Sequence, residues 1–138
     1  MNQLASLVFI VFLGGYSVFG QQNTDCILMT DSIFDIEYTI LPDVVPEYPG
    51  GIKEMNSFLL SNIEYPETGM CGMGMIYISF FVLKDGTITH IKVEKSFDDA
   101  IAQEGVKAIK KMPKWSPGKC NGNAVNVKYT IPINIHFR

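Results

Sequence analysis

The feature that most constrains the fold is the alternation of apolar and polar side chains over residues 123–138. The apolar positions are Val125, Val127, Tyr129, Ile131, Ile133, Ile135 and Phe137, and the positions between them include Asn126, Lys128, Thr130, Asn134 and His136. This period of two predicts a long β-strand with one buried face. Pro132 has no N–H to donate within a sheet, so we expect the strand at a sheet edge with Pro132 facing outward. Such an edge can pair with another extended chain.

Two further strands are predicted in the middle of the chain. Residues 74–83 are apolar on both faces, which is typical of a central strand. The Asp-Gly pair at residues 85 and 86 favours a tight hairpin turn. The next strand, at residues 87–96, has one polar face and suits the second edge of the sheet.

Two helices complete the expected fold. The first follows residues 46–51 and has Ile52, Met55, Phe58, Leu59 and Ile63 on its apolar face. The second runs to about Met112 and begins at a capping Asp98 or Asp99. These elements predict an α+β two-layer sandwich, in which a three-stranded antiparallel sheet of order 2-1-3 carries both helices on one face.

Composition restricts the class of protein. With 138 residues, of which 47% are hydrophobic, the chain can form one domain with a real core. The net charge is -3 and the lysines are scattered, which argues against a nucleic-acid partner, because no basic stripe is available for phosphates.

The N-terminal residues predict export. No charged side chain precedes Asp25, and residues 4–19 form a short apolar run. We expect residues 1–20 to be a signal peptide, residues 21–45 a lead-in segment and residues 46–138 the domain. Within the lead-in, residues 21–35 are expected to be loose, and residues 36–41 to form a short strand or an extended arm. An uncleaved anchor is the alternative; residues 4–19 are short against the roughly 20 apolar residues of a membrane span. The protein is therefore expected in the periplasm or cell envelope, or held at the inner membrane if the segment is retained.

Three cysteines, Cys26, Cys71 and Cys120, predict at most one disulfide in an exported chain, and the sequence does not select the pair. The sulfur-rich residues 70–75 raise the alternative of a copper site, but methionine as a gap filler in the central strand is the simpler interpretation. His90 and His136 have no Ser, Cys or carboxylate at motif spacing. We expect no catalytic residue, no metal and no cofactor.

Several motifs in order resemble those of one family. They are P-E-Y-P-G-G at residues 46–51, N-I-E-Y-P at 62–66, the strand at 74–82 with its Asp-Gly turn, M-P-K-W-S-P-G at 112–118 and Y-T-I-P-I at 129–133. Over residues 46–137 the chain resembles the C-terminal domain of the TonB energy-transducer family, in the form common in Bacteroidetes-type envelopes. The expected fold is that of TonB and TolA C-terminal domains.

The resemblance implies a binding domain and not an enzyme. In this family the domain engages an extended segment of an outer-membrane TonB-dependent receptor by strand addition on the last strand, for energised transmembrane transport. The residues implied in partner binding, through their backbones, are Val127, Lys128, Tyr129, Thr130, Ile131 and Ile133.

One feature departs from the family pattern. Full transducers connect a membrane helix to this domain through a long Pro-rich spacer, whereas residues 21–45 hold a single proline, Pro42. About 25 residues reach at most on the order of 80 Å when stretched. The alternative function is therefore an accessory or regulatory envelope protein that self-associates as a homodimer through its edge strands and transduces no energy.

Overall fold

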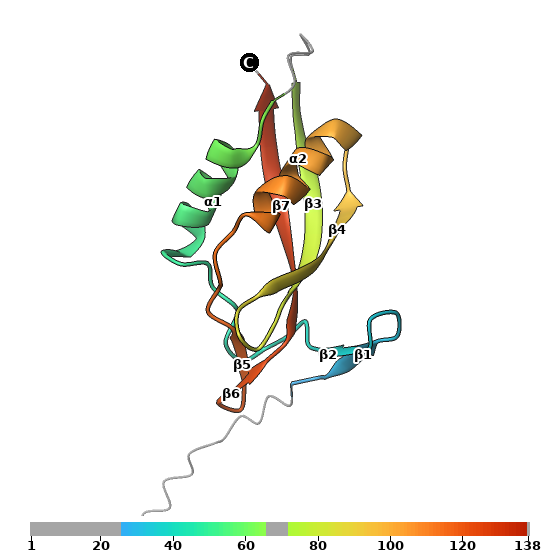
Figure 1. Ribbon diagram of the computed structural model, residues 1–138, viewed down its shortest axis with the longest axis vertical. Coiled ribbons are helices and arrows are strands. Elements are labelled where there is room, and N and C mark those ends of the chain that lie inside the picture. Colours follow the sequence, from blue (N-terminus) through green and yellow to red (C-terminus); the bar gives the residue numbers. More distant parts are fainter. Residues whose placement is uncertain (1–25, 66–71, 138) are drawn as a thin grey trace, which may run out of the picture.

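The computed structural model describes residues 26–65 and 72–137 of the chain. Its central sheet has three antiparallel strands in the order β4-β3-β7, formed by β3 (Gly72–Val82), β4 (Ile88–Lys95) and β7 (Val127–Phe137). Two helices, α1 (Gly51–Asn62) and α2 (Asp99–Lys110), lie against this sheet (Figure 1). The predicted α+β class, the central strand and both edge strands are confirmed.

The core lies between the sheet and the helices. It combines alternate residues of β3 and β7 with the inward residues of both helices, namely Ile76, Ile78, Phe80, Val82, Ile131, Ile133, Ile135, Met55, Leu59, Ile101, Ala108 and Ile109. Helix α2 crosses the sheet closely at Gly105, where an added Cβ would lie 2.9 Å from Ile78 Cδ1 and 3.6 Å from Ile133 Cδ1. Both helices therefore cover the same face of the sheet. We call the opposite face the outer face.

The helix boundaries follow the predicted signals, with one correction. Asp98 caps α2 as expected, because its Oδ1 accepts a hydrogen bond from the Ile101 N–H at 2.9 Å. In α1, Met55 and Leu59 are buried as predicted, but Ile52 is 67% exposed. Ile52 sits in the first turn, so the helix meets the core only from Met55 onward.

The Asp-Gly turn between β3 and β4 is also confirmed. The Leu83 N–H donates to Thr87 O at 2.9 Å, and the Gly86 N–H donates to Leu83 O at 2.8 Å. Gly86 has a φ of 86°. A Cβ at this position would collide with the carbonyl oxygen of Trp115, so the turn requires glycine for both backbone angle and space.

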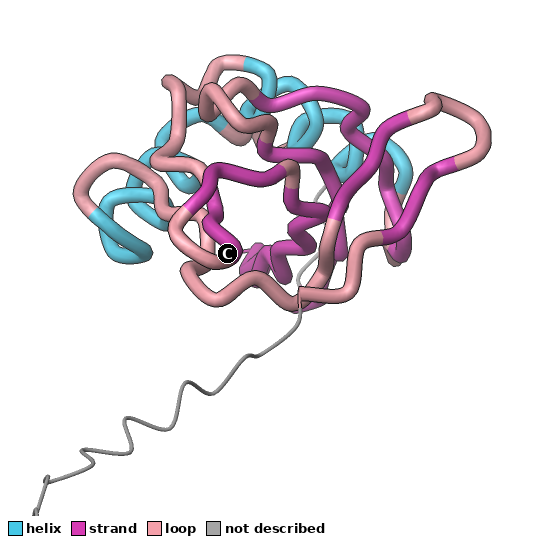
Figure 2. The backbone as a smooth tube through the Cα atoms, turned by 90° about the horizontal axis from the view of Figure 1, so that it is seen from below, coloured by secondary structure: helices cyan, strands magenta, loops and turns pink. Residues whose placement is uncertain are grey.

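Residues 29–31 of the lead-in, which were expected to be loose, are ordered, and a short strand, one of the two structures expected for residues 36–41, is present there. Two short strands, β1 (Met29–Asp31) and β2 (Ile36–Tyr38), form an antiparallel hairpin that projects sideways from the sheet (Figures 1 and 2). A disulfide joins Cys26 to Cys120. Cys120 ends β5 (Gly118–Cys120), which pairs with β6 (Asn123–Val125). We use "lead-in" below for residues 26–47.

Backbone contacts hold the rest of the lead-in to the domain. Val44 bridges to Lys119 and Glu47 bridges to Ser116. The Asn121 N–H donates to Asp43 Oδ2 at 2.7 Å. The sequence did not predict this docking, because its contacts join residues far apart in the chain. The predicted signal peptide and Cys71 lie outside the described residues. Within the described ranges, no helix has the length and apolar character needed to cross a membrane.

Candidate functional site

The outer edge of β7 is the candidate site. Strand β7 pairs with β3 in an unbroken antiparallel register from Gly72 opposite Phe137 to Val82 opposite Val127. Because backbone groups of successive residues in a strand point to opposite sides, every second residue of β7 turns its N–H and C=O away from β3. The Lys128 N–H points outward, since it donates to Thr39 O. The outward residues are therefore Lys128, Thr130, Pro132, Asn134 and His136.

Pro132 occupies an outward position, as its missing N–H required. Tyr77 is its partner in the register, and β7 ends the sheet on this side. The ladder to β3 consequently loses no donor at Pro132. The predicted edge position of β7 is confirmed, and Pro132 faces away from β3 as predicted.

The first part of this edge is already occupied. Thr39 forms a parallel bridge opposite Val127, in which the Thr39 N–H donates to Asn126 O and the Lys128 N–H donates to Thr39 O, both at 3.0 Å. The Asn126 side chain reinforces the contact, because its Nδ2 donates to Glu37 O at 2.9 Å and its Oδ1 accepts from the Lys84 N–H at 3.0 Å. Thr39 is fully buried. The lead-in thus covers the edge at residues 126–128.

The second part of the edge is open. Among the described residues, the outward amides of Thr130, Asn134 and His136 have no hydrogen-bond partner, and Thr39 is the only residue that pairs with β7 from this side. The side chains of Thr130, Pro132, Asn134 and His136 are all exposed. We call residues 130–136 the free edge.

The six residues implied by the family resemblance are distributed unevenly over this edge. They are Val127, Lys128, Tyr129, Thr130, Ile131 and Ile133, and the backbones of the four odd-numbered residues point to β3. Val127, Ile131 and Ile133 are buried, and Tyr129 packs against the Trp115 ring at 5.3 Å. Lys128 already bonds Thr39. Of the six, Thr130 alone keeps an outward amide without a partner among the described residues.

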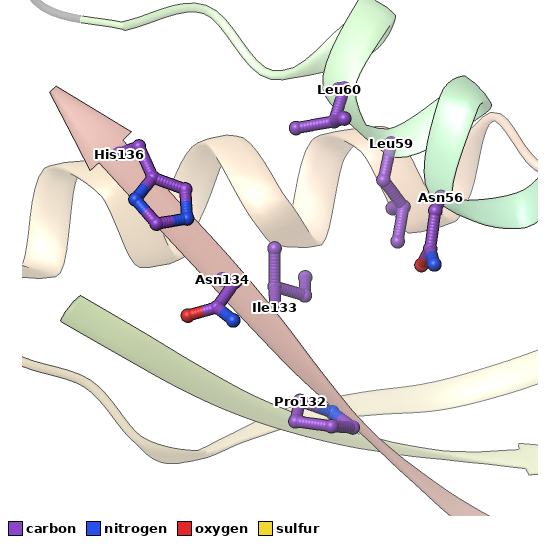
Figure 3. A pocket seen from close by; sticks show the side chains of 7 residues that line it. All are labelled: Asn56, Leu59, Leu60, Pro132, Ile133, Asn134 and His136. Carbon is purple, nitrogen blue, oxygen red and sulfur yellow. The ribbon is translucent and has the colours of Figure 1, made fainter. Parts of the chain in front are cut away.

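A groove borders the free edge on the helix side. It has a volume of about 310 Å³ and lies between α1 and β7, lined by Asn56, Leu59, Leu60, Pro132, Ile133, Asn134 and His136. Figure 3 shows Leu59 of α1 and Ile133 of β7 pointing toward one another across it. Leu59 and Ile133 are buried, whereas Leu60 is 56% exposed. Leu60 and Asn56 could not be predicted as site residues, because the apolar face of the predicted helix gives no sign that α1 borders the edge strand.

The hairpin of β1 and β2 covers part of the outer face of the sheet. The Tyr38 ring packs edge-on against Phe81 at 5.1 Å, and the Phe34 ring lies 4.1 Å from that of His90. Phe81 is consequently buried although it points away from the helices. His90, which has a φ of 52°, is exposed, and its ring packs against that of Phe34.

A small charged cluster lies on the same face, near the boundary between the covered and free parts of the edge. The Ser79 hydroxyl donates to Glu94 Oε1 at 2.6 Å, and the ammonium groups of Lys92 and Lys128 lie 3.6 and 3.9 Å from the Glu94 carboxylate. The Ser79 hydrogen bond, followed by the charges of Lys92 and Lys128, holds the pKa of Glu94 below its ordinary value. The side chain of Lys128 is thereby oriented on the outer face.

Metal-binding chemistry is weak in the described part of the chain. No group of three or more His, Cys, Asp or Glu side chains gathers there. Of the residues considered for copper, Met73 is 79% and Met75 40% exposed, and Cys71 lies outside the described ranges. The arrangement offers backbone hydrogen bonds beside an apolar groove, which is chemistry suited to an extended peptide.

Comparison with known proteins gives one family model and a similar solved structure. The family model for the Gram-negative bacterial TonB protein C-terminal matches residues 62–137, more than half of the chain. An NMR solution structure of the Helicobacter pylori TonB C-terminal domain is similar, with 27% sequence identity and a TM-score of 0.49. The match covers 61% of this chain and 90% of that one. None of the curated proteins compared with the chain matches it.

Proposed function

Because the chain belongs to the family of Gram-negative bacterial TonB C-terminal domains, we propose that it is a protein-binding module of the cell envelope. Its partner is an extended segment of an outer-membrane TonB-dependent receptor. The segment binds by strand addition to the free edge of β7. The proposed role is binding in energised transport, with no catalytic step.

The open half of the β7 edge carries this proposal. Three amides, those of Thr130, Asn134 and His136, and the outward carbonyls between them are spaced for pairing with a fourth strand. Each backbone hydrogen bond contributes about 0.5–1.5 kcal/mol net. Association itself costs at least about 4 kcal/mol. Backbone pairing therefore fixes the register of the partner, and buried side chains must supply further affinity.

The Cys26–Cys120 disulfide supports an envelope location. Disulfides persist in oxidising compartments such as the periplasm and are rare in the cytosol. The proposed location is the periplasm, with the exported chain either released or held at the inner membrane by residues 4–19.

Replacement of Thr130 by proline tests the proposal. This change removes one outward amide and leaves the ladder to β3 intact, because the Thr130 N–H does not point to β3. We expect a peptide from the N-terminal region of an outer-membrane receptor to bind Thr130→Pro at least tenfold more weakly than wild type, measured by isothermal titration calorimetry, since a hydrogen bond of about 1.4 kcal/mol corresponds to a factor of ten. Thr130→Val keeps the amide and is the matched control. Equal affinity of all three proteins, each folded, would rule out strand addition at this position.

A second function is favoured by the docked lead-in. Residues 26–47 bind back onto the domain through Cys26, Thr39, Val44 and Glu47, so they do not form an extended spacer. A module of this kind could instead act as an accessory envelope protein that dimerises through β7 and transmits no force. Sedimentation velocity separates the two functions. Self-association predicts a concentration-dependent dimer that Thr130→Pro weakens, together with no response to receptor peptides.

A further inference from the structure

The groove between α1 and β7 continues the edge on which Thr39 already sits. Thr39 shows how an extended residue docks on this edge: it lies opposite Val127, and its backbone bonds the residues on either side of Val127. A partner residue opposite Ile133, six residues further along β7, would find the same arrangement of backbone groups. There the Pro132 carbonyl can accept a hydrogen bond from the partner backbone, and the Asn134 N–H can donate one to it. This arrangement does not use an N–H of residue 132, so proline at that position loses no hydrogen bond.

Proline excludes the neighbouring position for the same kind of bridge. A residue opposite Ile131 would need a donor at residue 132, and Pro132 has none. Within the free edge, the bridge opposite Ile133 is therefore intact where the one opposite Ile131 is not. The bridge opposite Ile135 is also intact, because the Asn134 carbonyl and the His136 N–H flank it, but of the two only Ile133 lines the groove. The partner residue that meets the groove is therefore the one opposite Ile133.

Side chains of residues directly opposite each other in a sheet point to the same face. Ile133 points to the helix side, where Figure 3 shows it facing Leu59 of α1. A partner residue opposite Ile133 therefore directs its side chain into the groove, regardless of whether the partner strand runs parallel or antiparallel to β7. The aliphatic residues that line the groove are Leu59, Leu60 and Ile133.

The lining of the groove determines which side chain fits. Leu59 and Ile133 are buried at its base, and Leu60 presents a half-exposed apolar surface beside them. The polar lining residues are Asn56, Asn134 and His136, and no lining residue is a Lys, Arg, Asp or Glu. A charged partner side chain would lose hydration without gaining a counter-charge. An aliphatic side chain would cover Leu60 and lose no hydrogen bond.

We propose that the partner of this edge is an extended segment of another protein that carries an aliphatic side chain opposite Ile133, and that Leu60 is a specificity-determining residue for it. This inference rests on the proposed strand addition and adds the chemistry of the partner. The covered half of the edge defines where the segment begins, and the groove defines which residue it must contain.

A peptide series tests the proposal with the full chain. The probe is an acetylated and amidated nine-residue peptide of alternating Thr and Val, with Leu, Ala or Asp as the central guest residue. Binding is followed through the backbone amide signals of Thr130, Asn134 and His136. We expect the Leu guest to bind about tenfold more tightly than the Ala guest, as for aliphatic groups in apolar pockets. The Asp guest should bind about a hundredfold more weakly than the Leu guest.

Leu60→Asp should abolish the preference, so that the Leu and Ala guests bind within about twofold of each other. Ile52→Asp is the matched control, because Ile52 is a similarly exposed aliphatic residue of α1 outside the groove. Thermal denaturation of both variants verifies that each is folded. The tenfold preference should survive in Ile52→Asp.

The possible failures are distinct. Amide shifts on the free edge with equal affinity for all three guests would overturn the specificity inference and leave strand addition standing. An unchanged preference in Leu60→Asp would overturn the assignment of Leu60. A complete lack of response at Thr130, Asn134 and His136 would overturn strand addition itself, and with it this inference.

Discussion

The two halves of the outer edge of β7 differ although they belong to one strand. Residues 126–128 are paired with Thr39, whereas residues 130–136 have no partner among the described residues. Both halves have the same alternation of side chains and the same regular register with β3. The difference arises from a segment far away in the sequence. How much edge a strand offers is therefore a property of the whole chain and not of the strand.

The covered half is held by a short set of long-range contacts. The disulfide from Cys26 to Cys120 fixes the start of the lead-in, and Asn126 bonds both Glu37 and Lys84. The free half has an open groove on its helix side instead. Substitutions in the lead-in should therefore lower stability and leave the free edge intact. Substitutions in the free edge should weaken partner binding and leave stability unchanged.

Removal of the tether should have the largest effect. We expect Cys26→Ser combined with Cys120→Ser to lower the free energy of unfolding by about 3 kcal/mol, because the bond closes a loop with a sequence separation of 94 residues. Urea denaturation followed by fluorescence of the single, buried Trp115 measures this. Cys71→Ser is the control, since Cys71 takes no part in the bond. Equal stability of the double variant and wild type would show that the tether does not hold the lead-in.

Proline at Thr39 should have the next largest effect. Thr39→Pro removes the N–H that donates to Asn126 O at a fully buried position, at an expected cost of about 2 kcal/mol. Thr130→Pro removes an amide that has no partner among the described residues and should cost less than about 1 kcal/mol. The midpoints of urea denaturation, compared at equal dependence of the free energy of unfolding on urea, give both losses in stability. A larger loss of stability in Thr130→Pro than in Thr39→Pro would contradict the assignment of residues 126–128 as the covered half and residues 130–136 as the free half.

Two asparagines, Asn126 just before β7 and Asn134 within it, provide a finer test. Asn126→Ala breaks the side-chain hydrogen bonds to Glu37 O and Lys84 N, and we expect a loss of about 1 kcal/mol. Asn134→Ala changes an exposed side chain on the free edge and should stay within about 0.5 kcal/mol of wild type. Thermal denaturation of the two variants side by side measures the difference. Similar losses would mean that Asn126 does not clamp the lead-in.

The smallest expected effect concerns Glu94, next to the boundary between the halves. Its pKa is lowered in the folded chain, mainly by the Ser79 hydroxyl and then by Lys92 and Lys128. Its contribution to stability is therefore complete above the pKa of the unfolded chain and is lost as the pH falls through the lower, folded value. We expect Glu94→Gln to be less stable than wild type at pH 7 by under about 1 kcal/mol. The two proteins should converge in acid, and a gap that widens below pH 4 would contradict this assignment.

The sheet and its helices could be predicted because their signals are local. Alternation defined β7, two-sided apolarity defined β3, and the Asp-Gly pair defined the turn at Gly86. Pro132 alone identified β7 as an edge strand. Ile52 was wrongly assigned to the buried face of α1, since periodicity does not reveal where along a helix the contact with the core begins.

The docking of the lead-in on the domain could not be predicted, because it depends on partners far away in the chain. Thr39 gives no local sign that it will bridge Val127, and three cysteines allow more than one pairing. Two local signals were available: residues 36–41, which predicted a short strand or an extended arm, and Cys26, which lies in the part expected to be loose. The groove was missed for a similar reason: it forms between Leu60 and the far edge of a strand that begins more than sixty residues later.

Amide hydrogen exchange of the full chain, with and without a receptor-derived peptide, tests the central claim most directly. In the free protein, the Lys128 amide should be protected by Thr39, and the amides of Thr130, Asn134 and His136 should exchange rapidly. With peptide bound, exchange at these three amides should slow at least tenfold, and that of Lys128 should stay unchanged. Rapid exchange of all three under saturating peptide, or protection that appears at Lys128 alone, would contradict a partner strand on the free edge.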